Sequence, residues 1–272
     1  MPVSCDWLSD RFPGIRGFLA ATLLLALAGC AGGLDPAMPV ADSHGVMTLD
    51  VGGMPVKFQP IDGWCPASRD LTRSVLREAQ EEIKVLVVFG GCKEMRTAHD
   101  IDDPIPNFGM LAVPTEMWST DIGNDRAAFV DLIAENLGAI DLAAAMKEEM
   151  DSRRAQIQSR IDAAKRAGMT LQVDDPIDLG LLVHDDDAAC FGVNLRVVTG
   201  LASSDAYTKD IGIVTLFCAT ELQGRAVICM MQTQLEPSPR SSRSRSLEPV
   251  LKLVRSQVKR LIELNPDQGL AI

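Results

Sequence analysis

Two short segments of the chain each join a histidine to several carboxylates. They are His99, Asp100, Asp102 and Asp103 in the first segment, and His184, Asp185, Asp186 and Asp187 in the second. Imidazole nitrogens and carboxylate oxygens bind divalent metal ions and also act as general acids and bases. Carboxylates that are adjacent in sequence diverge, so each segment by itself is expected to be a solvated turn. A mixed histidine–carboxylate metal site, or a hydrolytic site, requires that the two segments meet in space.

The first segment does not fit a calcium-binding EF-hand loop. Counting from Asp100, the sixth position is Ile105 where the loop needs glycine, and the twelfth is Leu111 where it needs glutamate. The chain also has no G-x-S-x-G, H-E-x-x-H, C-x-x-C, P-loop or G-x-G-x-x-G motif. The sequence therefore predicts no cofactor and favours a non-enzymatic role. A carboxylate-based hydrolase stays as the alternative, because paired acids need no local motif.

A basic segment near the C-terminus contrasts with the formal net charge of −11 of the whole chain. Its bases are Arg240, Arg243, Arg245, Lys252, Arg255, Lys259 and Arg260. Such a segment can bind anionic lipid headgroups or an acidic partner. The alternative is the solvated outer face of an amphipathic helix, neutralised in part by the acidic remainder of the protein. The acidic balance of the chain argues against nucleic-acid binding.

The N-terminus has the layout of a secretory signal sequence. Arg11 and Arg16 precede an apolar run over residues 17–29, which is shorter than the roughly 20 residues that span a membrane. The run ends in Leu27-Ala28-Gly29-Cys30, which resembles the lipobox of bacterial lipoproteins. The resemblance implies that residues 1–29 are a signal peptide that is removed, and that Cys30 carries lipid.

A lipid on Cys30 predicts where the protein is held. Each buried CH₂ group contributes about 0.8 kcal/mol, so two or more acyl chains anchor a protein stably. The resemblance implies attachment to the cell envelope on the periplasmic side, and Ala31 after the cysteine slightly favours the outer membrane over the inner membrane. Residues 30–45 are small and turn-rich, which predicts a flexible tether. We expect the membrane and another envelope protein as partners, and the sequence carries no signal for the oligomeric state.

The cysteines of the exported part are expected to pair, because thiols oxidise in extracytoplasmic compartments. Cys65 precedes a predicted helix and Cys92 follows the next strand, which makes them one candidate disulfide. Cys218 and Cys229 are the second candidate pair, because a two-residue turn midway between them would place them directly opposite each other. Cys190 would then be left over. For both pairs, buried free thiols are the alternative.

The first half of the folded part mixes strands and helices. Residues 46–58 predict a hairpin turned at Gly52-Gly53, and Ser68 is expected to cap a helix that runs to about Lys84. The apolar runs 84–90 and 108–114 predict neighbouring strands that are buried on both faces. A helical segment over about residues 125–167 follows, capped by Asn124 or Asp125, interrupted at Gly138 and stopped at Gly168.

The second half of the chain returns to a period of two. Segments 177–184, 189–198 and 212–235 predict strands of an antiparallel meander, with a turn at Gln223-Gly224. A last helix is expected to begin at Pro249 and to end at Asn265-Pro266. The fold class is therefore α+β, with an antiparallel sheet covered by helices in a single domain over residues 46–272.

The stretch FQPIDGW, residues 58–64, resembles the opening of PsbP-like domains, a group that includes DcrB-type lipoproteins. The long middle helical segment departs from that compact pattern. The resemblance implies a non-enzymatic accessory or assembly role, with no catalytic residues to carry over. We therefore expect a lipid-anchored envelope protein that binds or assembles other envelope components. The alternative is a periplasmic hydrolase or metal-dependent enzyme that uses the histidine–aspartate segments.

Overall fold

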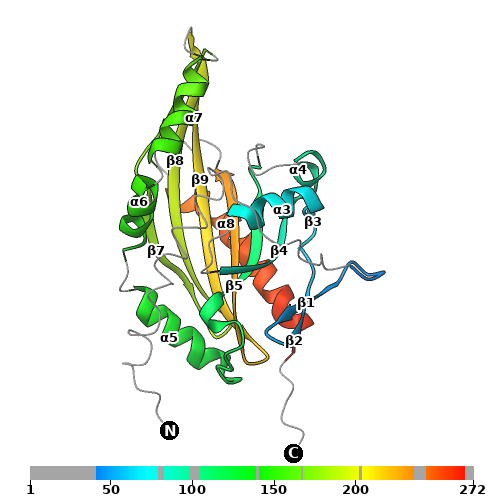
Figure 1. The fold of residues 1–272 in the computed structure, drawn as a ribbon. Helices are drawn as coiled ribbons and strands as arrows, with labels where there is room; N and C mark the ends of the chain where they lie inside the picture. The colour runs from blue at the N-terminus through cyan, green and yellow to red at the C-terminus, as the bar shows by residue number, and fades with distance from the viewer. Residues whose placement is uncertain are drawn as a thin grey trace, which may run out of the picture.

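A computed structural model describes most of the chain beyond its first forty residues (Figure 1). The described residues are 41–78, 83–98, 105–138, 141–152, 154–166, 168–201, 204–235 and 243–266. They form an α+β fold around an eight-stranded antiparallel sheet, as the sequence predicts. Cys30 and the signal-like segment lie outside the described residues.

A small hairpin of β1 (Met47–Val51) and β2 (Met54–Phe58) begins the fold apart from the main sheet. It turns at Gly52 and Gly53, which have φ angles of 57° and 88°, as expected for a two-residue hairpin turn. Ordered structure starts earlier than the predicted tether allows. The Asp42 carboxylate accepts hydrogen bonds from the backbone N–H groups of His44 and Val46, and Ala41 forms a bridge with Met47. The last residues of the expected tether therefore belong to the folded part.

Alanine substitutions at the two turn glycines are expected to lower the free energy of unfolding by different amounts. A Cβ atom on Gly52 would clash with the backbone oxygen of Trp118, whereas a Cβ on Gly53 would meet nothing within 4 Å. Gly53→Ala should lose about 1 kcal/mol of unfolding free energy, because alanine disfavours the left-handed conformation. Gly52→Ala should lose at least about 2 kcal/mol, because it adds a backbone clash to the same cost. Urea unfolding of the two variants measures the difference, and equal losses would contradict the close approach of Gly52 to Trp118.

One end of the main sheet is built from strands with two helices between them. These elements are β3 (Trp64–Pro66), α3 (Arg69–Glu78), β4 (Ile83–Gly91), α4 (Cys92–Thr97) and β5 (Phe108–Pro114). Ser68 caps α3 as predicted, because its Oγ accepts the Leu71 N–H at 3.2 Å. The expected extension of this helix to Lys84 is wrong, since Ile83 already pairs with Pro114 across β4 and β5. Non-local pairing outweighs helix propensity there.

The middle of the chain is helical. After a short 3-10 turn, η1 (Thr115–Met117), come α5 (Arg126–Gly138), α6 (Leu142–Ser152) and α7 (Arg154–Arg166). Asp125 is the cap of α5, with its carboxylate accepting the Ala128 N–H at 3.0 Å. Gly138 ends α5 and Gly168 follows α7 with a φ of 76°, so both predicted glycine boundaries are confirmed. The predicted second helix is present as two shorter helices, α6 and α7.

The second half supplies the long strands of the sheet. They are β6 (Met169–Val173), β7 (Ile177–His184), β8 (Ala189–Leu201), β9 (Ser204–Leu222) and β10 (Arg225–Leu235). The sheet order is β3-β4-β5-β10-β9-β8-β6, and β7 also pairs with β8. The turn between β9 and β10 lies at Gln223 and Gly224, with φ angles of 51° and 80°, which confirms the predicted hairpin and its register. β8 and β9 extend beyond the other strands (Figure 1), and α7 contacts β6.

The last helix, α8 (Arg243–Leu264), crosses the sheet and contacts β9, β10 and β2 (Figure 1). Its end before Asn265-Pro266 is as predicted, but its start is not. Pro249 lies inside the helix instead of opening it. A proline ring removes one backbone hydrogen bond and is tolerated in a helix interior at a cost of about 3 kcal/mol. Leu247, which precedes Pro249 in the helix, packs against the hydrophobic core.

Candidate functional site

The second histidine–aspartate segment forms the turn between β7 and β8, and this turn joins helices on opposite faces of the sheet. The His184 Nε2 atom lies 2.7 Å from a carboxylate oxygen of Asp131 on α5. The next residue, Asp185, accepts a hydrogen bond from the Arg255 guanidinium on α8 at 2.8 Å. Successive residues of a strand point to opposite faces, so these two neighbours diverge. Their side chains do not converge on one reacting group.

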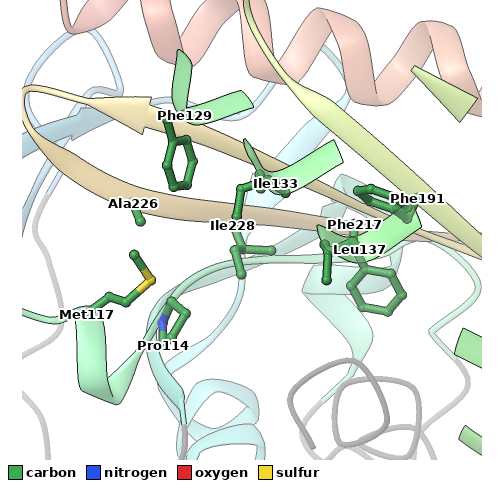
Figure 2. Close-up of a pocket in the computed structure, with 10 residues that line it drawn as sticks. Pro114, Met117, Phe129, Ile133, Leu137, Phe191, Phe217, Ala226 and Ile228 are labelled. Carbon is green, nitrogen blue, oxygen red and sulfur yellow. The ribbon is translucent and has the colours of Figure 1, made fainter. Parts of the chain in front are cut away.

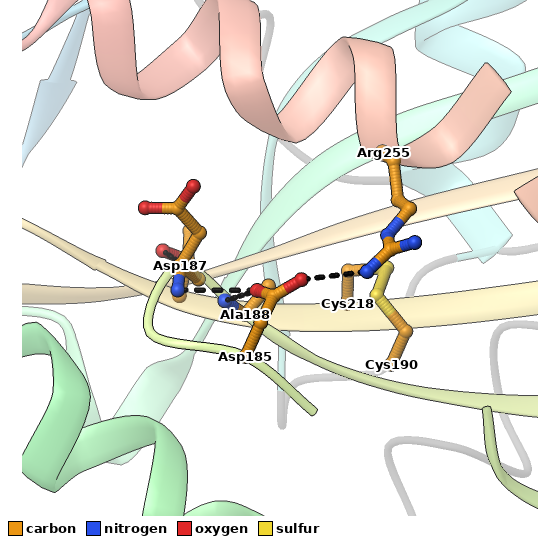
Figure 3. Close-up of a disulfide and its surroundings, with 7 residues drawn as sticks. Asp185, Asp187, Ala188, Cys190, Cys218 and Arg255 are labelled. Atoms are coloured by element: carbon orange, nitrogen blue, oxygen red, sulfur yellow. Dashed lines mark hydrogen bonds and ion pairs between the residues drawn. A yellow bond between two sulfur atoms is a disulfide. The ribbon is translucent and has the colours of Figure 1, made fainter. Parts of the chain in front are cut away.

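The Asp185 carboxylate also organises its own turn (Figure 3). It accepts hydrogen bonds from the N–H groups of Asp187 and Ala188 at 3.2 and 3.1 Å, in addition to the one from Arg255. Partial burial works to raise the pKa of Asp185, but the hydrogen bonds from Arg255 and from the backbone outweigh it and hold the pKa below its ordinary value. The carboxylate is therefore a fixed anion that ties the turn to α8.

Asp185→Asn predicts a change in acid sensitivity. A carboxylate with a lowered pKa in the folded state stabilises the protein above its unfolded-state pKa, and this contribution is lost as the pH falls through the folded-state pKa. The variant should lose less than about 1 kcal/mol at pH 7, because both partners are partly exposed to solvent. Below about pH 4 its melting temperature should approach that of the wild type. Thermal unfolding between pH 7 and pH 2.5 measures this, and a gap that stays constant would contradict it.

The described residues contain no group of three or more His, Cys, Asp or Glu side chains that could hold a metal ion. His184 pairs with Asp131, and Asp185 pairs with Arg255, so this segment does not assemble a metal site there. The other predicted ligands, His99, Asp100, Asp102 and Asp103, lie outside the described residues. The meeting of the two segments therefore stays a prediction.

Most of the predicted basic segment lies on α8, where carboxylates accompany the bases. Arg255 pairs with Asp185, and Arg260 pairs with Asp62 at 3.2 Å. Lys259 lies 3.9 Å from Glu263. The remaining bases are Arg243, Arg245 and Lys252 within α8 and Arg240, which lies outside the described residues. The acidic part of the protein thus compensates much of this positive charge, as one of the two sequence interpretations expects.

Two disulfides are present among the described residues. Cys65 and Cys92 are joined as the sequence predicts, with their Cα atoms 4.8 Å apart. The predicted bond between Cys218 and Cys229 is wrong, because Cys218 is joined to Cys190 on β8. Cys229 is a buried free thiol. Cys190, expected to be left over, is therefore a disulfide partner.

The register explains this correction. Cys218 lies opposite Cys229 on one side and opposite Cys190 on the other. A residue in a central antiparallel strand directs both its N–H and its C=O toward one neighbouring strand, and its non-hydrogen-bonded partner on the other side is about 1 Å closer. The Cα atoms of Cys190 and Cys218 are 4.1 Å apart, which marks the closer type of pair. The hairpin turn by itself places Cys218 opposite Cys229. It does not indicate that Cys190 on β8 lies closer to Cys218.

An apolar cavity lies between α5 and the face of the sheet that α5 covers (Figure 2). Phe129, Ile133 and Leu137 of α5 line it together with Phe191 and Phe217 of the sheet. Its volume of about 30 Å³ is close to that of one water molecule. Ligand pockets usually have volumes of roughly 300 Å³ or more. The cavity is therefore a packing gap in this structure, without polar groups for catalysis.

A buried carboxylate that no sequence pattern predicts lies at the β9–β10 turn, opposite Ala226, which lines this cavity. Glu221 is fully buried, accepts a hydrogen bond from the Gly224 N–H and lies 3.9 Å from Arg126 of α5. The Arg126 guanidinium also donates to the Glu221 backbone oxygen at 2.9 Å. These contacts hold the start of α5 on the hairpin. The sequence carries no local signal for them, because the two residues are far apart along the chain.

The large hydrophobic side chains that are exposed in the described part of the chain gather at one edge of the sheet. They are Met169 (45% exposed), Ile177 (49%) and Leu181 (40%). All three lie on β6 or β7, which both pair with β8. β6 and β7 pair with different stretches of β8: Met169 lies opposite Leu201, whereas Ile177 and Leu181 lie opposite Asn194 and Phe191.

No family model matches the chain, and no curated protein matches it. The resemblances to bacterial lipoproteins and to PsbP-like domains therefore stay predictions from the sequence. The two disulfides indicate an oxidising, extracytoplasmic compartment. In the described residues, no helix has the length and apolar character needed to cross a membrane.

Proposed function

We propose that the chain is a lipid-anchored protein of the cell envelope whose folded domain binds or assembles other envelope components. Lipid on Cys30 holds the domain on the periplasmic side, with the outer membrane slightly favoured. The observation that carries the binding role is the divergence of His184 and Asp185, two of the candidate catalytic groups in the described part of the chain. His184 and Asp185 contact different helices on opposite faces of the sheet, and the nearby cavity is small and apolar. An enzyme would need these groups to converge in a concave pocket.

The disulfides support the compartment in this proposal. A chain with the Cys65–Cys92 and Cys190–Cys218 bonds matures in an oxidising environment, which agrees with export directed by the signal-like N-terminus. The lipobox-like stretch before Cys30 adds the anchor. Together these features favour a domain that works close to a membrane surface.

Labelling of cells with a radioactive fatty acid tests the anchor. The wild-type chain should incorporate label, and mass spectrometry should find an N-terminus that begins at acylated Cys30. The Cys30→Ala variant should carry no label and keep its uncleaved N-terminus. An unlabelled wild-type chain with residues 1–29 still attached would overturn the anchor and the envelope location together.

Co-purification from detergent-solubilised membranes tests the binding role. Two variants address separate surfaces: Lys252→Glu/Lys259→Glu reverses charge on α8, and Ile177→Ser/Leu181→Ser removes apolar side chains from the β7 edge. Lys93→Glu is the charge control, because Lys93 is an exposed base on α4. We expect the same envelope protein to co-purify with the wild type and the control and to be lost from one surface variant. If no envelope protein co-purifies with the wild type, the binding role is wrong.

A further inference from the structure

Three cysteines lie in one row across three neighbouring strands. Cys190 on β8, Cys218 on β9 and Cys229 on β10 are direct cross-strand partners, so their side chains point to the same face of the sheet. All three are at most 1% exposed. Cys218 occupies the middle of the row, with its disulfide on one side and the free thiol of Cys229 on the other. This order places a thiol, a central sulfur and a leaving sulfur in the sequence that thiol–disulfide exchange requires.

We propose that these three residues form an intramolecular disulfide relay, which moves the cross-link from the β8–β9 pair to the β9–β10 pair. The Cys229 thiolate attacks Cys218 Sγ, and a bond forms between these two sulfurs. The bond between Cys218 and Cys190 breaks, and Cys190 leaves as a thiolate that takes up the proton given up by Cys229. One disulfide and one thiol exist before and after the step, so no oxidant or reductant takes part.

The surroundings of the two ends of the row differ. Leu111 of β5 is the other cross-strand neighbour of Cys229, and burial raises the pKa of the Cys229 thiol to about 12. The disulfide end lies near charged groups, since Arg255 of α8 and Asp185 of the β7–β8 turn are in its surroundings (Figure 3). Arg255 and Asp185 are paired with each other at 2.8 Å, so both a positive and a negative charge lie near this end of the row. The scarcity of the Cys229 thiolate makes the relay slow at neutral pH.

The relay changes what holds the β7–β8 turn. Cys190 is the second residue of β8, and the turn before it carries the contacts to Asp131 of α5 and Arg255 of α8. The resting disulfide ties this end of β8 covalently to β9. After exchange, only hydrogen bonds and packing hold it there. The position of one cross-link thus controls how firmly the turn is attached, independently of the proposed envelope function.

Peptide mapping of the full chain tests the relay. The protein is incubated at pH 7, 8 and 9, quenched with acid, denatured and treated with N-ethylmaleimide before digestion. Trypsin cleaves after Arg196, Lys209 and Arg225, which puts the three cysteines on separate peptides. We expect a linked Cys218–Cys229 peptide pair whose rate of appearance rises about tenfold for each pH unit. The three pH values all lie below the pKa of about 12 of the Cys229 thiol, so the thiolate fraction rises about tenfold with each unit.

The Cys65–Cys92 bond is the internal control for this experiment. Exchange within the folded protein leaves that peptide pair intact, whereas global unfolding creates mixed pairs that contain Cys65 or Cys92. The relay is overturned if the Cys218–Cys229 pair never appears, or if it appears only together with such mixed pairs.

Two single variants provide a second test. Oxidised Cys190→Ala should contain a Cys218–Cys229 disulfide, and Cys229→Ala should keep the Cys190–Cys218 bond at every pH. A folded Cys190→Ala protein that keeps two free thiols after oxidation would contradict the relay. If this variant does not fold, the mapping of the wild-type chain still decides the question.

Discussion

Replacing Gln257 by Leu is expected to lower the free energy of unfolding by about 3 kcal/mol, although the new side chain is apolar and of similar size. Gln257 lies on α8 and is fully buried. Its side-chain oxygen accepts the Ile61 N–H at 3.0 Å, and its amide donates to the Gln59 oxygen at 3.1 Å. Leucine would leave the buried Ile61 N–H and the part-buried Gln59 oxygen without these partners, at about 1–3 kcal/mol for each. Urea unfolding followed by circular dichroism measures the loss.

Ser256→Ala is the matched control, because Ser256 is the exposed neighbour of Gln257 on the same helix. It should change stability by less than about 0.5 kcal/mol. A small effect of Gln257→Leu, comparable with that of the control, would mean that water satisfies Gln59 and Ile61 when the amide is absent. The attachment of α8 to this segment would then depend on apolar packing alone.

Other polar side chains near Gln257 also hydrogen-bond the backbone of residues 57–61. Asn265 bonds both backbone groups of Lys57, accepting its N–H and donating to its oxygen at 2.7 Å each. Arg260 donates to the Pro60 oxygen, also at 2.7 Å. Side chains of α8, and Asn265 just after it, therefore hydrogen-bond the backbone along residues 57–61. This explains why buried polar residues interrupt the apolar face of the helix.

Removal of the Cys65–Cys92 disulfide should have an effect of similar size. The bond closes a loop with a sequence separation of 27 residues. On the chain-entropy model, opening such a loop costs about 3.5 kcal/mol, mainly because the unfolded chain gains freedom. Cys65→Ala/Cys92→Ala should therefore shift the urea midpoint strongly downward, while the far-ultraviolet circular dichroism of the folded protein stays close to that of the wild type.

Cys229→Ala is the control for this experiment, because it removes a buried sulfur without opening a cross-link. It should cost about 1 kcal/mol through lost packing. If the double variant lost no more than this control, the cross-link would not constrain the unfolded chain, and the chain-entropy account would not apply here.

Many local features of the fold could be read from the sequence, because each depends on a few consecutive residues. The hairpin turns at Gly52-Gly53 and Gln223-Gly224 require left-handed backbone, which glycine permits. Ser68 and Asp125 cap helices through their own side chains. Alternation of apolar residues gave the strands of the meander, and with them the α+β class and the cross-strand position of Cys218 and Cys229.

The tertiary structure decided the features that depend on residues far apart in sequence. The bond of Cys218 to Cys190 follows from which neighbouring strand its backbone faces, a property of three strands together. The links of His184 to α5 and of Asp185 to α8 depend on helices that pack on opposite faces of the sheet. A sequence pattern specifies which face of an element is apolar, but packing of the whole chain selects the element that covers it. For this reason the turns, caps and strands follow from the sequence by itself, whereas the chemical partners of the candidate site residues do not.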